Sequence, residues 1–246
     1  MNPSVVLGDR PLESAELLAL LTQYQMLPQL LKEQLIDRAI QDIVLTADEE
    51  GLALKQFYAQ QHIEDQAQRE AWLKYHRMSA ERLSNQAFRR FKLEKFKHQT
   101  WDAAIEADFL KLKPQMDRFI CSIIRTRNLE LAQELYFRLK EGEQTFADLA
   151  PRYSEGPEAQ TSGMIGPVPA SGLHPKLVQV LSNGRPGQLW PPQRLEEWCI
   201  ILKLEQYLPA HLDATTQQQL LQRRFQEWLE QQLETVQFSI PGDPRP

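Results

Sequence analysis

Cysteine and histidine are the residue types best suited to nucleophilic or metal chemistry, and this chain has few of them. The two cysteines, Cys121 and Cys199, stand in apolar, strand-like segments that suit buried free thiols in a reducing compartment. The five histidines, at positions 62, 76, 98, 174 and 211, show none of the spacings that converge on a metal, such as CxxC or HExxH. We therefore expect no metal and no cofactor.

Hydrolysis, nucleotide binding and nucleic-acid binding find no support in the motifs. No serine lies in a Gly-x-Ser-x-Gly turn, and the segment Gly163–Gly166 is too short for a phosphate-binding loop. In Phe88–Lys97 three phenylalanines alternate with five basic residues, a spacing that favours an amphipathic helix with a solvated basic face over an RNA-stacking surface. The net charge of -5 also argues against a nucleic-acid partner.

Length and composition describe an ordinary globular protein. The 246 residues are 42% hydrophobic and 25% charged, enough for one large or two small domains with a real core. No apolar run approaches the roughly 20 residues that cross a bilayer, so we expect no membrane insertion. The N-terminus lacks the pattern of a secretory signal, which predicts a cytoplasmic protein.

The first 116 residues predict a helical domain. Glycine and proline are sparse, and apolar residues recur at helical spacing, as in Leu31, Leu35, Ala39 and Ile43. Thr46–Glu49 has the form of a capping box, with a hydroxyl at the cap and a carboxylate three residues later. We expect about five helices before Pro114.

Residues 117–208 predict an α+β domain. We expect strands at 118–126, 164–166, 188–190 and 198–204, and helices at 129–140, after Thr145 and at 175–181. The segment Trp198–Leu204 is apolar on both faces, as a central strand should be.

A long amphipathic helix is predicted within residues 209–238, followed by a proline-rich tail at 239–246. Its apolar face needs a partner, and the helical domain of residues 1–116 is the natural one. We therefore expect the α+β domain to be inserted between two parts of one helical domain.

Five short motifs occur within residues 118–208 in a fixed order. They are Phe146-Ala-Asp-Leu-Ala150, Tyr153-Ser-Glu155, Gly163-Met-Ile-Gly166, Pro186-Gly187 and Lys203-Leu-Glu205. As a set they resemble the parvulin family of peptidyl-prolyl cis-trans isomerases, and the whole chain resembles the SurA- and PrsA-type foldases. The resemblance implies a parvulin-like four-stranded antiparallel sheet with surrounding helices, inserted in an all-α SurA-like helical domain.

The resemblance also implies where a substrate groove would lie. In parvulins two strand histidines, a Cys or Asp, and a Met and Phe that hold the proline ring surround the groove. Here the first-strand histidine falls on Ser122, the Cys or Asp on Gly156, the Met and Phe on Leu173 and Leu177, and the last-strand histidine on Ile200. Ser122 is the candidate catalytic residue, and the other four are candidate groove residues. The alternatives are a strand hydroxyl bonded to backbone for Ser122, and plain core packing for Leu173, Leu177 and Ile200.

Three functions follow as hypotheses. The first is a parvulin-type foldase that acts on Xaa-Pro segments of unfolded or export-bound polypeptides, with weak or lost catalysis because both histidines are absent. The second is a non-enzymatic peptide-binding chaperone or adaptor on a degenerate parvulin fold, with an export-system component as an expected partner. The third is a structural subunit of a larger assembly.

Overall fold

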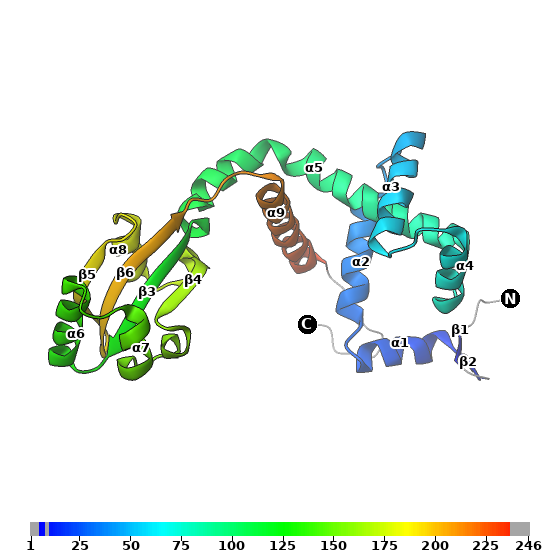
Figure 1. Ribbon diagram of the computed structural model, residues 1–246. Coiled ribbons are helices and arrows are strands. Elements are labelled where there is room, and N and C mark those ends of the chain that lie inside the picture. The colour runs from blue at the N-terminus through cyan, green and yellow to red at the C-terminus, as the bar shows by residue number, and fades with distance from the viewer. Residues whose placement is uncertain (1–4, 8–9, 237–246) are drawn as a thin grey trace. The chain divides into compact units, whose positions relative to one another are not determined.

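The computed structural model describes residues 5–7 and 10–236, and they form two compact units (Figure 1). The helical unit contains the chain up to Ile105 and again from Gln217, and the inserted unit is Glu106–Thr216. This division confirms that an α+β domain interrupts one helical domain. Its boundaries fall inside helices α5 (Ala80–Met116) and α9 (Ala214–Thr235), whereas the sequence suggested residues 116/117 and 208/209.

Helices make up most of the helical unit. They are α1 (Ser14–Gln23), α2 (Leu27–Ile40), α3 (Ala47–Gln60), α4 (Gln66–Tyr75), most of α5 and most of α9. An antiparallel pair of three-residue strands, β1 (Val5–Leu7) and β2 (Arg10–Leu12), precedes them. The sequence did not predict this pair, because three residues are too few for an alternating pattern to be recognised.

The capping box at α3 is present as predicted. Thr46 Oγ1 accepts a hydrogen bond from the Glu49 backbone N–H at 3.3 Å, and the Glu49 carboxylate accepts one from the Thr46 backbone N–H at 2.9 Å. These bonds satisfy amides that have no partner within the helix, and so fix where α3 begins.

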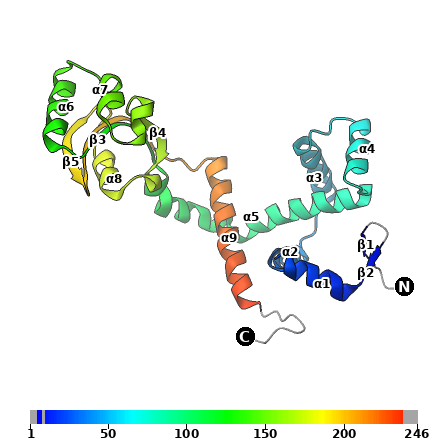
Figure 2. The same cartoon turned by 90° about the horizontal axis from the view of Figure 1, so that it is seen from below.

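Helix α9 packs on the helical unit, as the amphipathic pattern predicted. Phe225 of α9 is buried with Ile36 and Ile40 of α2. Trp228 of α9 contacts Phe96 of α5, and α9 lies against the middle of α5 in two views (Figures 1 and 2). The predicted tail at 239–246 lies outside the described residues.

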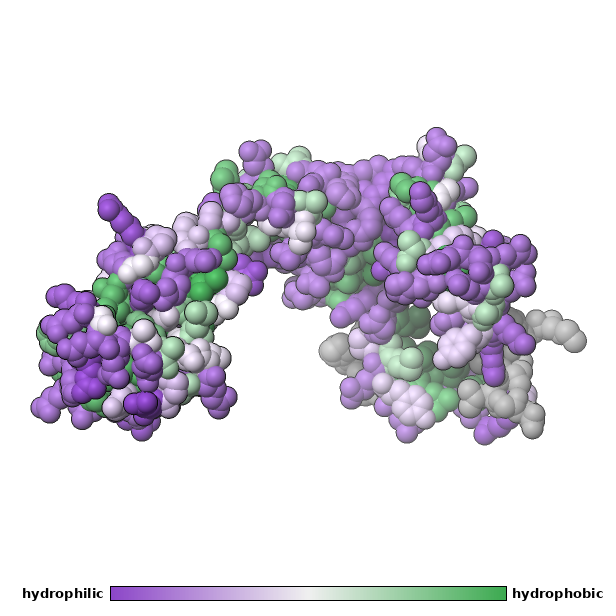
Figure 3. Space-filling view, in the orientation of Figure 1, coloured by the Kyte–Doolittle hydropathy of each residue, from purple (hydrophilic) through white to green (hydrophobic). Residues whose placement is uncertain are grey.

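On the face seen in Figure 3 the surface over α5 is mainly hydrophilic.

The inserted unit is built on a four-stranded antiparallel sheet of order β4-β3-β6-β5. Its strands are β3 (Arg118–Thr126), β4 (Met164–Pro169), β5 (Leu189–Leu195) and β6 (Trp198–Leu208). Its helices are α6 (Leu129–Glu141), α7 (Phe146–Tyr153) and α8 (Pro175–Ser182), with short 3-10 turns at Pro157–Thr161 and Ala170–Gly172.

Helices cover both faces of this sheet. On one face Cys121, Ile123 and Leu202 pack with Leu177 and Leu181 of α8. On the other face, Ile124 and Ile201 pack with side chains of α6 and α7. The fold is therefore the predicted α+β class, with β3 and β6 as buried central strands. No helix among the described residues is long and apolar enough to span a membrane.

Candidate active site

Ser122 lies in the middle of β3 and is almost fully buried, with 3% of its surface exposed. Its hydroxyl donates a hydrogen bond to Glu205 Oε1 on β6 at 2.7 Å. The other oxygen of Glu205 accepts a hydrogen bond from Lys203 Nζ at 3.0 Å. The Ser122 hydroxyl thus helps to satisfy a carboxylate between paired strands, and its partner is a side chain rather than the backbone.

Leu177 and Ile200 belong to the apolar core beneath α8. They are 7% and 4% exposed, and both pack in one cluster with Phe119, Cys121 and Leu202. Leu173 is partly buried and packs against the same cluster. These three residues lie together, as a groove would require, but Leu177 and Ile200 offer almost no surface to a ligand.

The structure does not bring Ser122 together with these apolar residues. Cys121 and Ile123 face α8, whereas Ile124 faces α6 and α7. Side chains alternate along a strand, so Ser122 shares the face of Ile124 and lies opposite Leu177. A site that combines the Ser122 hydroxyl with the α8 wall cannot form on this sheet.

Gly156 stands at the start of the loop after α7, where its lack of a side chain makes room for two others. A Cβ atom at this position would collide with the side chains of Arg125 and Glu158. The space beside Gly156 is therefore filled by the side chains of Arg125 and Glu158.

The pair formed by Arg125 and Glu158 is the main charged feature of the inserted unit's interior. Arg125 Nε donates to Glu158 Oε1 at 2.8 Å, and Ser154 Oγ donates to the same oxygen at 2.5 Å. The Glu158 side chain is fully buried, and its Oε2 has no hydrogen-bond partner among the described residues. Because Arg125 is paired with Ile200 across the strands, this ion pair lies on the α8 face.

A second set of hydrogen bonds fixes the same loop to the end of β3. Glu155 Oε1 accepts hydrogen bonds from Thr126 Oγ1 at 2.8 Å and from the Arg127 backbone N–H at 2.9 Å. The bond from the Arg127 amide, followed by that from Thr126, lowers the pKa of Glu155. The carboxylate stays ionised and acts as an anchor.

These groups provide little acid–base chemistry near neutral pH. No histidine lies in β3 or β6. Burial, followed by the nearby charge of Glu205, raises the pKa of the Cys121 thiol to about 11, so the thiol stays neutral. Among the described residues, no cluster of His, Cys, Asp and Glu is arranged to hold a metal ion.

The sequence analysis named Gly156 as a candidate groove residue but did not find the Arg125–Glu158 pair beside it. The two residues are 33 positions apart, and neither belongs to a motif of fixed spacing. The closest signal was the charge of Arg125 directly after the apolar pair Ile123 and Ile124, since a charge in a buried strand needs a partner.

Comparisons with solved structures return foldases and isomerase domains. PrsA from Bacillus cereus is 17% identical, with 97% of this chain and 94% of that chain covered and a TM-score of 0.49. PrsA from Bacillus anthracis is 17% identical, with 86% and 100% covered and a TM-score of 0.43. A PpiC-type peptidyl-prolyl cis-trans isomerase domain is 22% identical, with 41% and 99% covered and a TM-score of 0.38. No curated protein matches the chain.

The family model described as "Rotamase: PPIC-type PPIASE domain" matches residues 112–206. This range contains β3, all three helices of the inserted unit, β4, β5 and most of β6. The ordered motifs, the sheet and the family match agree, and the chain therefore carries a PPIC-type peptidyl-prolyl isomerase domain of the parvulin family.

Proposed function

We propose that this protein is a parvulin-type folding factor for proline-containing, unfolded or export-bound polypeptides, and that its prolyl isomerisation is much slower than that of an intact parvulin. The observation that carries the proposal is the match to a PPIC-type domain whose strands β3 and β6 contain no histidine.

The reaction itself needs no covalent step. Rotation about an Xaa-Pro bond crosses a barrier of roughly 18 to 20 kcal/mol because the twisted amide loses resonance. A catalyst must hold the proline ring and favour the twisted form in a preorganised, water-poor site. Leu173 gives an apolar contact for such a ring. Ser122 and Ile200, onto which the resemblance places the two family histidines, lie on opposite faces of the sheet.

A non-enzymatic peptide-binding chaperone on the same fold is the second candidate. It is favoured by the burial of Leu177 and Ile200, which narrows any groove beneath α8. Under this proposal the domain contacts proline-containing segments without accelerating their isomerisation, and the helical unit holds the client.

Exchange spectroscopy by NMR on a panel of Xaa-Pro peptides separates the two candidates. The variant Leu173→Asp places a negative charge where we expect the proline ring to bind. The control variant Leu129→Asp makes the same change at an exposed position at the start of α6. Thermal unfolding followed by circular dichroism verifies that both variants fold.

Faster exchange that is lost in Leu173→Asp but kept in Leu129→Asp would establish catalysis. Line broadening of the peptides at an unchanged exchange rate would establish binding alone. If neither effect occurs, the domain does not act on Xaa-Pro segments and the proposal fails.

A further inference from the structure

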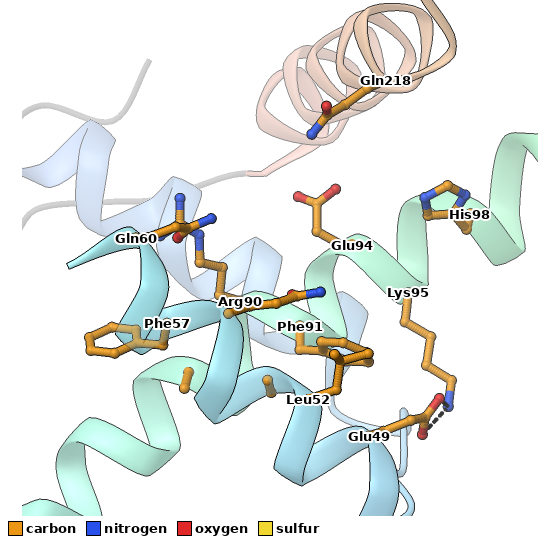
Figure 4. A pocket seen from close by; sticks show the side chains of 13 residues that line it. Glu49, Leu52, Phe57, Gln60, Arg90, Phe91, Glu94, Lys95, His98 and Gln218 are labelled. Carbon is orange, nitrogen blue, oxygen red and sulfur yellow. Dashed lines mark hydrogen bonds and ion pairs between the residues drawn. The ribbon is translucent and has the colours of Figure 1, made fainter. Parts of the chain in front are cut away.

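The helical unit contains a cavity lined by residues of α3 and α5, with Gln218 of α9 also in its lining (Figure 4). Its volume of about 630 Å³ lies within the range of roughly 300 to 1,000 Å³ that is typical of ligand pockets. Among its apolar lining residues, Phe57 and Ala87 are buried, while Leu52 and Phe91 keep part of their surface exposed.

Most charges that line this cavity are already neutralised. Lys95 Nζ donates to both carboxylate oxygens of Glu49 at 2.7 and 2.8 Å, and this bond is the main reason why the pKa of Glu49 is lowered. Glu94 is paired with Lys97 Nζ at 2.7 Å. Arg90 also lines the cavity and has no carboxylate partner among the described residues, so its positive charge is unpaired.

The neighbouring arginine on α5, Arg89, is by contrast held in ion pairs. Arg89 Nη2 contacts Glu33 at 2.8 Å and Arg89 Nε contacts Asp37 at 2.5 Å, both on α2. His98, at the end of the cavity, is hydrogen-bonded to Asp102 at 3.0 Å. The charge of Arg90 is thus available to a bound molecule.

Three amide side chains line the same cavity without a side-chain hydrogen bond in the described part of the chain: Gln56, Gln60 and Gln218. An amide offers both donors and an acceptor. An extended polypeptide presents an N–H and a C=O at nearly every residue, and these groups need partners when water is removed. The lining therefore suits a peptide backbone as well as an anion.

We propose that this cavity binds a short extended polypeptide segment in which an aspartate or glutamate stands near a leucine-like side chain. The carboxylate contacts Arg90, the apolar side chain packs on Leu52 and Phe91, and the glutamine amides bond to the backbone. This inference rests on the proposed function, which supplies the class of ligand, a polypeptide. It adds the binding site and a preference for acidic over basic segments. A basic segment is disfavoured because its charge would repel Arg90.

The test uses the full chain and three fluorescently labelled peptides of equal length. They share one leucine-containing sequence and differ only at two positions. These two positions are both acidic residues in the first peptide, both amide residues in the second and both lysines in the third. Fluorescence anisotropy gives each dissociation constant. Arg90→Gln removes the free charge, and Arg82→Gln makes the same change at an exposed site on α5 outside the cavity. Leu52→Gln, with Leu30→Gln of α2 as its control, tests the apolar wall at residues of similar exposure, 46% and 44%.

We expect the acidic peptide to bind about three- to fivefold more tightly than the amide peptide, the range of a partly exposed ion pair. Arg90→Gln should abolish this difference and Arg82→Gln should keep it, while Leu52→Gln should weaken all peptides and Leu30→Gln none. Equal affinity for the three peptides, or an unchanged preference in Arg90→Gln, would overturn the proposal. So would self-association of the wild type that Leu52→Gln abolishes, because the occupant would then be a second copy.

Suppression of client aggregation, measured on the same samples, separates this inference from the proposed function. A wild type that suppresses aggregation but binds the three peptides equally would refute the selectivity alone. A wild type that neither suppresses aggregation nor binds any peptide would refute both.

Discussion

Arg125 Nε donates a hydrogen bond of 2.8 Å to the fully buried carboxylate of Glu158, and this ion pair fills the space that a side chain at position 156 would need. It joins β3 to the loop after α7 on the face covered by α8. The stability of the inserted unit should therefore depend on keeping both partners.

Replacing Arg125 by leucine should lower the free energy of unfolding by about 3 kcal/mol, because it leaves a buried carboxylate unpaired. Arg127→Leu is the control, since its ion pair with Glu197 (3.5 Å) is exposed and should cost less than about 1 kcal/mol. Urea denaturation measures both. Equal losses for the two variants would contradict this role for the buried pair.

Two glycine-to-alanine substitutions should have opposite effects. Gly156→Ala should destabilise the protein by about 1 to 3 kcal/mol, because its Cβ would collide with Arg125 and Glu158. Gly51→Ala in α3 should stabilise it by about 0.5 to 1 kcal/mol, because no atom lies within 4 Å of the new Cβ and alanine favours a helix. Thermal unfolding measures both effects. Unchanged stability of Gly156→Ala would contradict the prediction, because it would show that the loop can move to make room for the new Cβ.

Much of this architecture is readable from local patterns in the sequence. The capping box at Thr46 and the amphipathic face of α9 depend on residues a few positions apart, and the structure contains both. The faces of β3 could not be read in this way, because apolar residues such as Cys121, Ile123 and Ile124 occupy both sides of a strand that is buried on both. The resemblance pointed to Ser122, whose side chain shares the face of Ile124 and lies opposite the cluster beneath α8.

The junction of α5 with β3 should make stability fall in acid. Burial by itself would raise the pKa of Asp117, but hydrogen bonds from Tyr207 (2.6 Å), Lys113 (2.9 Å) and the Ala210 backbone N–H (2.7 Å) outweigh it and hold that pKa below its ordinary value.

A carboxyl with a lowered pKa in the folded state stabilises the protein fully above its unfolded pKa of about 3.9 and loses this contribution as the pH falls through the folded value. Asp117→Asn should reduce stability at neutral pH and flatten the decline below about pH 4, whereas exposed Asp42→Asn should change neither. Urea unfolding across this pH range measures the effect. If Asp117→Asn loses stability in acid as steeply as the wild type does, groups other than Asp117 cause that loss.

The two cysteines should be unreactive in the folded protein. Cys121 is fully buried with a pKa raised to about 11, mainly by burial, and Cys199 is also buried. The thiolate is the reactive form, so alkylation at pH 8 should be slow until urea unfolds the inserted unit. Mass spectrometry of iodoacetamide-treated protein measures the labelling, and rapid modification of Cys121 without denaturant would contradict the buried position of β3.

The most direct test of the central claim is the refolding of a model protein whose slow phase is limited by prolyl isomerisation, which takes tens to hundreds of seconds at 25 °C. The refolding rate is measured with this protein and with an equal concentration of an intact parvulin. We predict that this protein suppresses aggregation of the refolding chain but accelerates the slow phase far less than the intact parvulin does. Equal acceleration by the two proteins would show that the inserted domain catalyses isomerisation efficiently without strand histidines, and would contradict this account.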